Sequence, residues 1–257
     1  LGSNVVTAAW SNGSTALKGY SVTGLTFTAP VVLSANYYDD YEFLGKNGIP
    51  DDATTGYSEM SGYGKRYSGG CKGQLTGNWT ARLTSQLAGS TYSVMYYDDR
   101  YRVIQRKGNN SLNGMEAVYT SYNFEGSPVK EKRIHSVPGQ DIITEVRNHT
   151  YDLANRLLQT TYQLNDDAPV ILVDNVYDEI GRLKTEKRTG HSKLRTDYTY
   201  NLRSWTKGIN GPLFHQTLTY QESIDGTTPC YNGNISSMIW KSGGSAATNE
   251  MGYRFTY

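Results

Sequence analysis

The sequence predicts an all-β protein made of tandem antiparallel hairpins, and three observations carry this prediction. Among the 257 residues there are 22 Tyr, against 5 Phe and 4 Trp, and Tyr suits the pleated, half-exposed surface of a strand. Gly numbers 27, and Gly suits tight turns because it adopts left-handed backbone conformations without strain. The third observation is an internal repeat in which Tyr is followed by Asp or Asn.

The repeat is clearest in three segments of the chain, and weaker copies continue in the same frame. The clear copies are Tyr96–Val103, Thr150–Leu157 and Val176–Leu183. The anchoring Tyr recurs at positions 97, 122, 151, 177, 200 and 220, so successive copies are 20 to 29 residues apart. A unit of that length supplies two strands of about seven residues and two connections.

One unit can be derived from its residue types. Before the Tyr, Asp197 to Tyr200 alternates with the period of two that is typical of a strand. The following Asp or Asn starts a turn, because its side chain can bond the backbone two residues on. Gly181, or Asn155 in the corresponding place, suits the left-handed conformation that closes a hairpin. The next Arg lies near the Tyr across the turn, and we expect its guanidinium to stack on that ring.

The motif resembles that of the YD-repeat, or Rhs-repeat, family of large secreted bacterial proteins, which is approximately G-x-x-x-R-Y-x-Y-D-x-x-G-R-L. The resemblance covers about residues 90–257, with Asn155 or Tyr101 in place of the motif Gly in two copies. The copies at Tyr200 and Tyr220 lack the Gly-Arg-Leu end. The predicted structural motif residues are Tyr97, Asp98, Arg102, Tyr151, Asp152, Arg156, Tyr177, Asp178, Gly181, Arg182 and Tyr200.

Three regions follow from the repeat pattern. Residues 1–28 are interpreted as the end of a preceding β module, and residues 29–90 as degenerate leading hairpins with a long loop over 45–72. Residues 91–257 are tandem hairpin repeats, the last of which is expected to be incomplete and to leave an exposed sheet edge at Tyr257. The resemblance implies that about fourteen strands join into one long, strongly curved sheet, part of a β-spiral or shell.

The function that the resemblance implies is structural. The chain would be a wall segment of an extracellular or bacterial cell-surface shell that encloses or displays an effector or toxin region. Its partners would be the remaining repeats and the effector region of the parent protein. We therefore predict that it is not an enzyme, and no catalytic residue is assigned.

Composition excludes several classes of partner. Lys and Arg total 25 and Asp and Glu total 24, so no basic face is available for nucleic acid. The longest apolar runs are strand-sized, which predicts no transmembrane segment. Cys71 and Cys230 lack the paired spacing of a zinc site, and their pairing in a disulfide stays open. No cofactor or metal is predicted.

Two alternative functions remain. The aromatic residues of the 45–72 loop could bind a glycan or another cell-surface ligand, because amphipathic rings stack on sugar faces. The candidates are Tyr57, Tyr63 and Tyr67. A glycan-active enzyme would instead need two carboxylates within about 10 Å of each other in a cleft, and no pair is singled out by the sequence.

Overall fold

The computed structural model describes residues 5–13, 15–83, 89–222, 226–243 and 249–257. Within these residues there are seventeen strands and two short 3-10 helices. None of the helices in this described part is long and apolar enough to span a membrane. The chain divides into two compact units, one of residues 1–147 with 164–166 and the other of residues 148–163 with 167–257.

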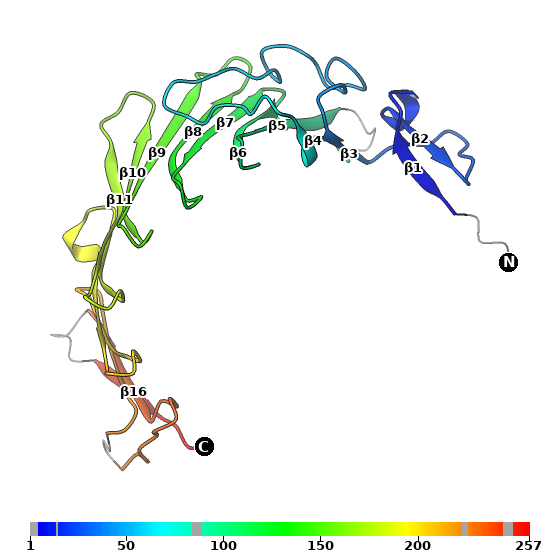
Figure 1. Ribbon diagram of the computed structural model, residues 1–257. Helices are drawn as coiled ribbons and strands as arrows, with labels where there is room; N and C mark the ends of the chain where they lie inside the picture. The colour runs from blue at the N-terminus through cyan, green and yellow to red at the C-terminus, as the bar shows by residue number, and fades with distance from the viewer. Residues whose placement is uncertain (1–4, 14, 84–88, 223–225, 244–248) are drawn as a thin grey trace. The chain divides into compact units, whose positions relative to one another are not determined.

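Two strands form a small sheet of their own, and the others form one large antiparallel sheet (Figure 1). The small sheet pairs β1 (Thr7–Trp10) with β2 (Tyr20–Thr23), and η1 (Thr15–Leu17) lies between them. In the large sheet each strand pairs with its neighbour in sequence, and η2 (Ser192–Leu194) lies between two of them. Its strands are β3 (Ser34–Asp39), β4 (Cys71–Ala81), β5 (Ser90–Tyr97), β6 (Val103–Asn109), β7 (Met115–Tyr122), β8 (Pro128–Ser136), β9 (Ile143–Tyr151), β10 (Leu157–Leu164), β11 (Val170–Tyr177), β12 (Leu183–Arg188), β13 (Arg195–Tyr200), β14 (Thr206–Asn210), β15 (Phe214–Thr219), β16 (Ser237–Ser242) and β17 (Glu250–Arg254).

The predicted all-β class and the run of consecutive antiparallel hairpins are confirmed. The large sheet has fifteen strands, where about fourteen were expected. Its two outermost strands are β3 and β17, and all five residues of β17 are exposed.

The first unit contains a hydrophobic core beneath a long loop. The buried cluster consists of Ala35, Tyr37, Phe43, Ile49, Trp79, Ala81, Val94 and Tyr96. Within it the ring of Phe43, from the loop, stacks on Tyr37 of β3 with centroids 4.5 Å apart. Phe43 also packs on the backbone of Gly77, where an added Cβ would lie 2.4 Å from the ring. Only Gly leaves room for the loop to lie this close to β4.

The predicted loop joins β3 to β4 and passes over the sheet of the first unit (Figure 1). Polar side chains from β6 hold it there. Lys107 is 4% exposed, and its Nζ donates to the carbonyls of Ala53 and Gly56 and to Ser58 Oγ. Gln105 bonds both the N–H and the carbonyl of Ser58. Because the buried polar groups of Lys107 and Gln105 find partners in the loop, the loop acts as a second layer over the core.

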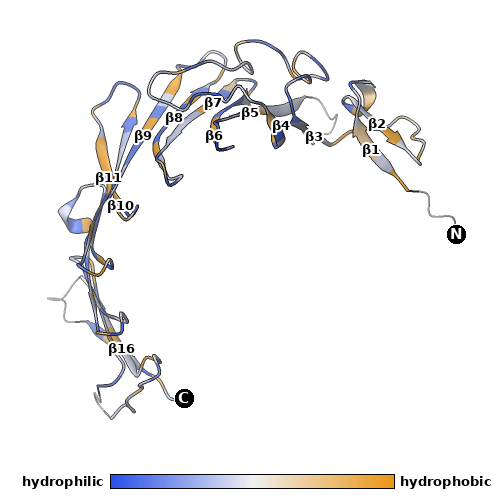
Figure 2. Ribbon diagram, viewed as in Figure 1, coloured by the Kyte–Doolittle hydropathy of each residue, from blue (hydrophilic) through white to orange (hydrophobic). Residues whose placement is uncertain are grey.

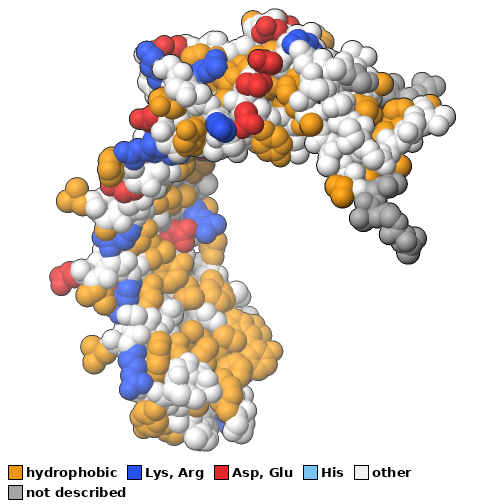
Figure 3. Space-filling model, turned by 45° about the vertical axis from the view of Figure 1, so that its right-hand side comes forward, with side chains coloured by type: hydrophobic (Ala, Val, Ile, Leu, Met, Phe, Trp, Pro, Cys, Tyr) orange, Lys and Arg blue, Asp and Glu red, His pale blue; other side chains and the backbone are white. Residues whose placement is uncertain are grey.

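The second unit has no comparable core. Among its described residues, Tyr220 is the one buried hydrophobic side chain, and most strand residues are half-buried. Strands of mixed hydropathy run through it (Figure 2), and hydrophobic side chains remain on its visible surface (Figure 3). A single-layered sheet lacks the burial that normally stabilises a domain. Contacts between neighbouring strands must supply more of the stability here.

Candidate functional site

The repeat motif forms the same turn at Asp98, Asp152 and Asp178. In the turn after β11, Asp178 Oδ1 accepts hydrogen bonds from the backbone N–H of Ile180 and Arg182. The N–H of Gly181 donates to the Asp178 carbonyl at 3.0 Å, and the N–H of Asp178 donates to the Arg182 carbonyl at 2.8 Å. Gly181 has φ 91°, so the turn is a type I turn closed by a left-handed residue. The strand register shifts at Tyr177, as expected for a bulge next to such a loop.

Equivalent turns begin at Asp98 and Asp152, and Asn takes the place of Asp at 123 and 201. The left-handed residues of the Asp turns are Tyr101 (φ 58°), Asn155 (φ 58°) and Gly181 (φ 91°). Asn201 Oδ1 accepts from the backbone N–H of Trp205 at 3.0 Å, as an Asp oxygen does elsewhere. The turn geometry therefore depends on a side-chain oxygen at its first position more than on Gly at its fourth.

Each Arg of the motif pairs with the Asp of its own turn. Arg102 Nε lies 2.7 Å from Asp98 Oδ2, and the same distance separates Arg156 from Asp152 and Arg182 from Asp178. Hydrogen bonds from the Arg156 side chain and backbone hold the pKa of Asp152 below its ordinary value. The turn thus fixes the orientation of a guanidinium group at the end of each of these hairpins.

The guanidinium groups lie over the Tyr of the following hairpin. The predicted contact was with the Tyr across the same turn, and the structure instead shows a contact between hairpins. The distances from guanidinium carbon to ring centroid are 4.8 Å for Arg102 and Tyr122, 4.7 Å for Arg156 and Tyr177, and 4.7 Å for Arg182 and Tyr200. The reason is geometric. The Asp of the turn binds the Arg side chain in an orientation that places the guanidinium over the following hairpin and not over the Tyr before the turn.

The Tyr completes the connection through its hydroxyl group. Tyr122 donates to the Val103 carbonyl at 2.8 Å, and Tyr200 donates to the Leu183 carbonyl at 2.7 Å. Both acceptors are the first residue of the return strand of the preceding hairpin. Tyr177 and Tyr220 make the same bond to Leu157 and Thr206. We call each Asp–Arg–Tyr set an inter-hairpin bridge: Asp98–Arg102–Tyr122, Asp152–Arg156–Tyr177 and Asp178–Arg182–Tyr200.

One copy replaces the charged member of the bridge by an aromatic ring. Trp205 stands where Arg stands in the other turns, and its ring lies 5.0 Å from that of Tyr220. The guanidinium carbon of Arg203 lies over the Trp205 ring, 5.3 Å from its centroid. The following Tyr is thus still covered by a flat group from the preceding turn, although the ion pair is lost.

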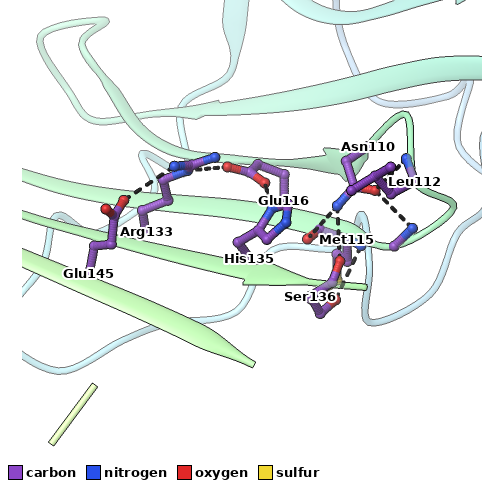
Figure 4. A network of polar contacts seen from close by, with 9 residues as sticks. Asn110, Leu112, Met115, Glu116, Arg133, His135, Ser136 and Glu145 are labelled. Carbon is purple, nitrogen blue, oxygen red and sulfur yellow. Dashed lines mark hydrogen bonds and ion pairs between the residues drawn. The ribbon is translucent and has the colours of Figure 1, made fainter. Parts of the chain in front are cut away.

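Polar contacts also cross the sheet of the first unit away from these turns (Figure 4). Glu116 of β7 accepts from Arg133 of β8 and lies 2.6 Å from His135 Nδ1, while Arg133 also bonds Glu145 of β9 at 3.2 Å. Burial acts to raise the pKa of Glu116, but the hydrogen bonds from Arg133 and His135 outweigh it and hold the pKa below its ordinary value. These contacts join three successive strands, which is a structural role.

The three loop tyrosines that were candidates for ligand binding do not converge on one site. The Tyr57 ring packs 5.4 Å from that of Tyr96, and its hydroxyl accepts from the Arg66 N–H. Tyr63 lies 6.1 Å from the Tyr119 ring. Tyr67 is 40% exposed and lines a pocket of about 390 Å³.

That pocket lies in the first unit, where the long loop leaves β3 and enters β4. It is lined by Asp39, Asp40, Tyr41, Glu42, Arg66, Tyr67, Ser68, Gly70, Cys71 and Tyr97. The Arg66 guanidinium lies 4.5 Å over the Tyr41 ring, and burial raises the pKa of the Tyr41 hydroxyl and of the Cys71 thiol. The sequence did not single out Tyr41 or Arg66, because no spacing links residues that meet only when the loop folds back.

Neither cysteine is bonded to the other. Cys71 is buried and donates to the Asp39 carbonyl, whereas Cys230 is half-buried, and both are free thiols. Among the described residues, no three His, Cys, Asp or Glu side chains lie close enough together to hold a metal ion.

The Asp98 turn predicts that replacing Asp98 destabilises the protein far more than replacing its neighbour Asp99. Asp98 is 7% exposed and accepts from two backbone N–H groups and from Arg102. Asp98→Ala should lower the free energy of unfolding by about 2–4 kcal/mol, because it leaves those donors unpaired. Exposed Asp99 is the matched control, and Asp99→Ala should change stability by less than about 0.5 kcal/mol. Urea unfolding of both variants checks this, and equal effects would contradict the role given to Asp98.

Comparisons with known proteins give a weak structural likeness. No family model matches the chain, and no curated protein matches it. Among solved structures, a chain in the crystal structure of TcdB2-TccC3-Cdc42 is similar over 86% of this chain, with a TM-score of 0.39 and 10% identity. This chain spans 13% of that one. The likeness is too low to carry an argument about function, which therefore rests on the chain's own geometry.

Proposed function

We propose that the chain is a structural YD-repeat scaffold, a wall segment of an extracellular or bacterial cell-surface shell that encloses or displays an effector region of its parent protein. The observation that carries this proposal is the inter-hairpin bridge, repeated at Arg102, Arg156 and Arg182. Its residues bond one another and the backbone, which favours a structural role for them. The proposal assigns no catalytic residue.

The form of the second unit supports the same function. A sheet one layer thick has two exposed faces, so it covers a large surface area with few residues. This suits a wall segment better than a compact domain would. The turns that end its hairpins are rigid, since each fixes its backbone through an Asp or Asn oxygen. Rigidity that does not depend on a core allows such a sheet to be extended hairpin by hairpin.

Protease protection in the full-length parent protein tests this proposal. We expect the effector region to be cleaved far more slowly when it is joined to the wall than when it is expressed alone. Asp98→Ala should accelerate cleavage by loosening the wall, whereas Asp99→Ala should not. An effector region that is cleaved equally fast with and without the wall would contradict enclosure.

Recognition of a carbohydrate or cell-surface ligand is a second candidate function, and the pocket beside Tyr67 favours it. A volume of about 390 Å³ suits a small ligand, and the exposed Tyr67 ring adjoins the carboxylates of Asp40 and Glu42. Rings and carboxylates together suit the faces and hydroxyl groups of a sugar.

A glycan array distinguishes this second function from a passive wall. Binding through the pocket predicts a signal that Tyr67→Ala abolishes and that Tyr63→Ala, outside the pocket, retains. The absence of any signal from the folded chain, or a signal that Tyr67→Ala leaves unchanged, would exclude this pocket as the binding site.

A further inference from the structure

The pocket beside Tyr67 holds charges of both signs that are not paired with each other. Its lining includes the carboxylates of Asp39, Asp40 and Glu42 and the guanidinium of Arg66. Within the described part of the chain, none of these four side chains takes part in an ion pair, whereas Lys65, outside the pocket, pairs with Glu59 at 3.6 Å. Opposite charges that face one pocket without neutralising each other remain available to a ligand.

Stacking holds the Arg66 guanidinium in place and leaves its edge available. The guanidinium carbon lies 4.5 Å from the Tyr41 ring centroid and 5.3 Å from that of Tyr96. Contact with rings uses the face of a guanidinium, whereas its N–H groups lie in its plane and match the two oxygens of a carboxylate. Arg66 is exposed, and its side chain donates no hydrogen bond to another described residue. The structure therefore presents an oriented group that can bind a carboxylate.

Two of the carboxylates are held through one oxygen each. Asp40 Oδ1 accepts from the N–H of Glu42 at 2.9 Å, and Asp39 Oδ1 accepts from the N–H of Gly73. A carboxylate has a second oxygen, which stays available to a cation. Asp40 is also half-buried, and an ammonium group is attracted more strongly to a carboxylate that is partly shielded from water.

The remaining lining of the pocket is neutral and partly aromatic. The N–H of Tyr67 donates to the Tyr97 carbonyl at 2.9 Å, which fixes the backbone that carries the exposed Tyr67 ring. Tyr97 and Cys71 are buried beside it. An open ring with charged groups around it, in a volume of about 390 Å³, suits a ligand about the size of a monosaccharide.

We propose that this pocket binds a sugar that carries both a free ammonium group and a carboxylate. The inference rests on the second candidate function, recognition of a carbohydrate, and names the class of sugar. The carboxylate of the sugar pairs with Arg66, its ammonium group pairs with Asp40 and Glu42, and its ring lies on Tyr67. Because the pocket carries three carboxylates and one guanidinium, the ammonium group contributes more to binding than the carboxylate does.

Isothermal titration calorimetry of the 257-residue chain with four related sugars tests the proposal. Muramic acid carries both charges, glucosamine carries the ammonium group alone, N-acetylmuramic acid the carboxylate alone and N-acetylglucosamine neither. At about pH 6 the amine is protonated and the carboxylate is ionised. Muramic acid should bind with a dissociation constant on the order of 0.1–1 mM. Each of the other three should bind at least about fivefold more weakly.

Substitutions assign the two charges to their partners. Arg66→Gln should weaken muramic acid binding at least about fivefold and leave glucosamine binding no weaker than in the wild type. Asp40→Asn/Glu42→Gln should remove the preference for muramic acid over N-acetylmuramic acid, and Asn retains the acceptor for the Glu42 N–H. Lys65→Gln removes the cation next to Arg66 but outside the pocket, so it should change neither affinity. Circular dichroism should show the same β content in all of these variants.

Several outcomes would overturn the proposal, and they separate it from the function on which it rests. Equal binding of all four sugars that Tyr67→Ala abolishes would keep the pocket as a sugar site and refute the role of charge. Free alanine that binds as tightly as muramic acid would show that the sugar ring is not recognised. No binding of any probe at about 10 mM, well above the expected dissociation constant, would refute the inference, and a silent glycan array would then also exclude the second candidate function.

Discussion

The contact on which the rest of the sheet depends is the one between an Arg and the Tyr of the next hairpin. A hairpin alone is marginally stable in water, and each backbone ladder constrains only two strands. The inter-hairpin bridge connects a turn to its neighbour through an ion pair, a cation–π contact and a hydroxyl-to-carbonyl hydrogen bond. Where the contact recurs, at Arg102, Arg156 and Arg182, it orients the next hairpin and helps to fix the register there.

The two units stabilise the same kind of hairpin by different means. In the first, the loop between β3 and β4 covers a core, and Lys107 satisfies three loop acceptors from beneath it. In the second, most strand residues are half-exposed, and the bridges at Arg156 and Arg182 have no comparable core beside them. The same motif therefore operates with and without hydrophobic burial, which fits a repeat that can be extended in either direction.

Much of this architecture could be predicted from the sequence, since the turn is local. Asp178, Gly181 and Arg182 lie within five residues, and their hydrogen bonds follow from ordinary turn chemistry. The partner of the Arg ring contact was missed, although a signal existed: Arg102 precedes Tyr122 by 20 residues, Arg156 precedes Tyr177 by 21 and Arg182 precedes Tyr200 by 18. The place of the long loop could not be predicted, because Lys107 and Gln105 look like ordinary polar strand residues until the loop covers them.

A double-mutant cycle tests the bridge most directly. Arg182→Ala and Tyr200→Ala, singly and together, should show a coupling free energy of about 0.5–1 kcal/mol in urea unfolding. The same cycle between Arg182 and Tyr177, the Tyr of its own turn, should be additive within about 0.3 kcal/mol. Coupling to Tyr177 without coupling to Tyr200 would show that the Arg stabilises its own hairpin alone, and the account of how the sheet propagates would then be wrong.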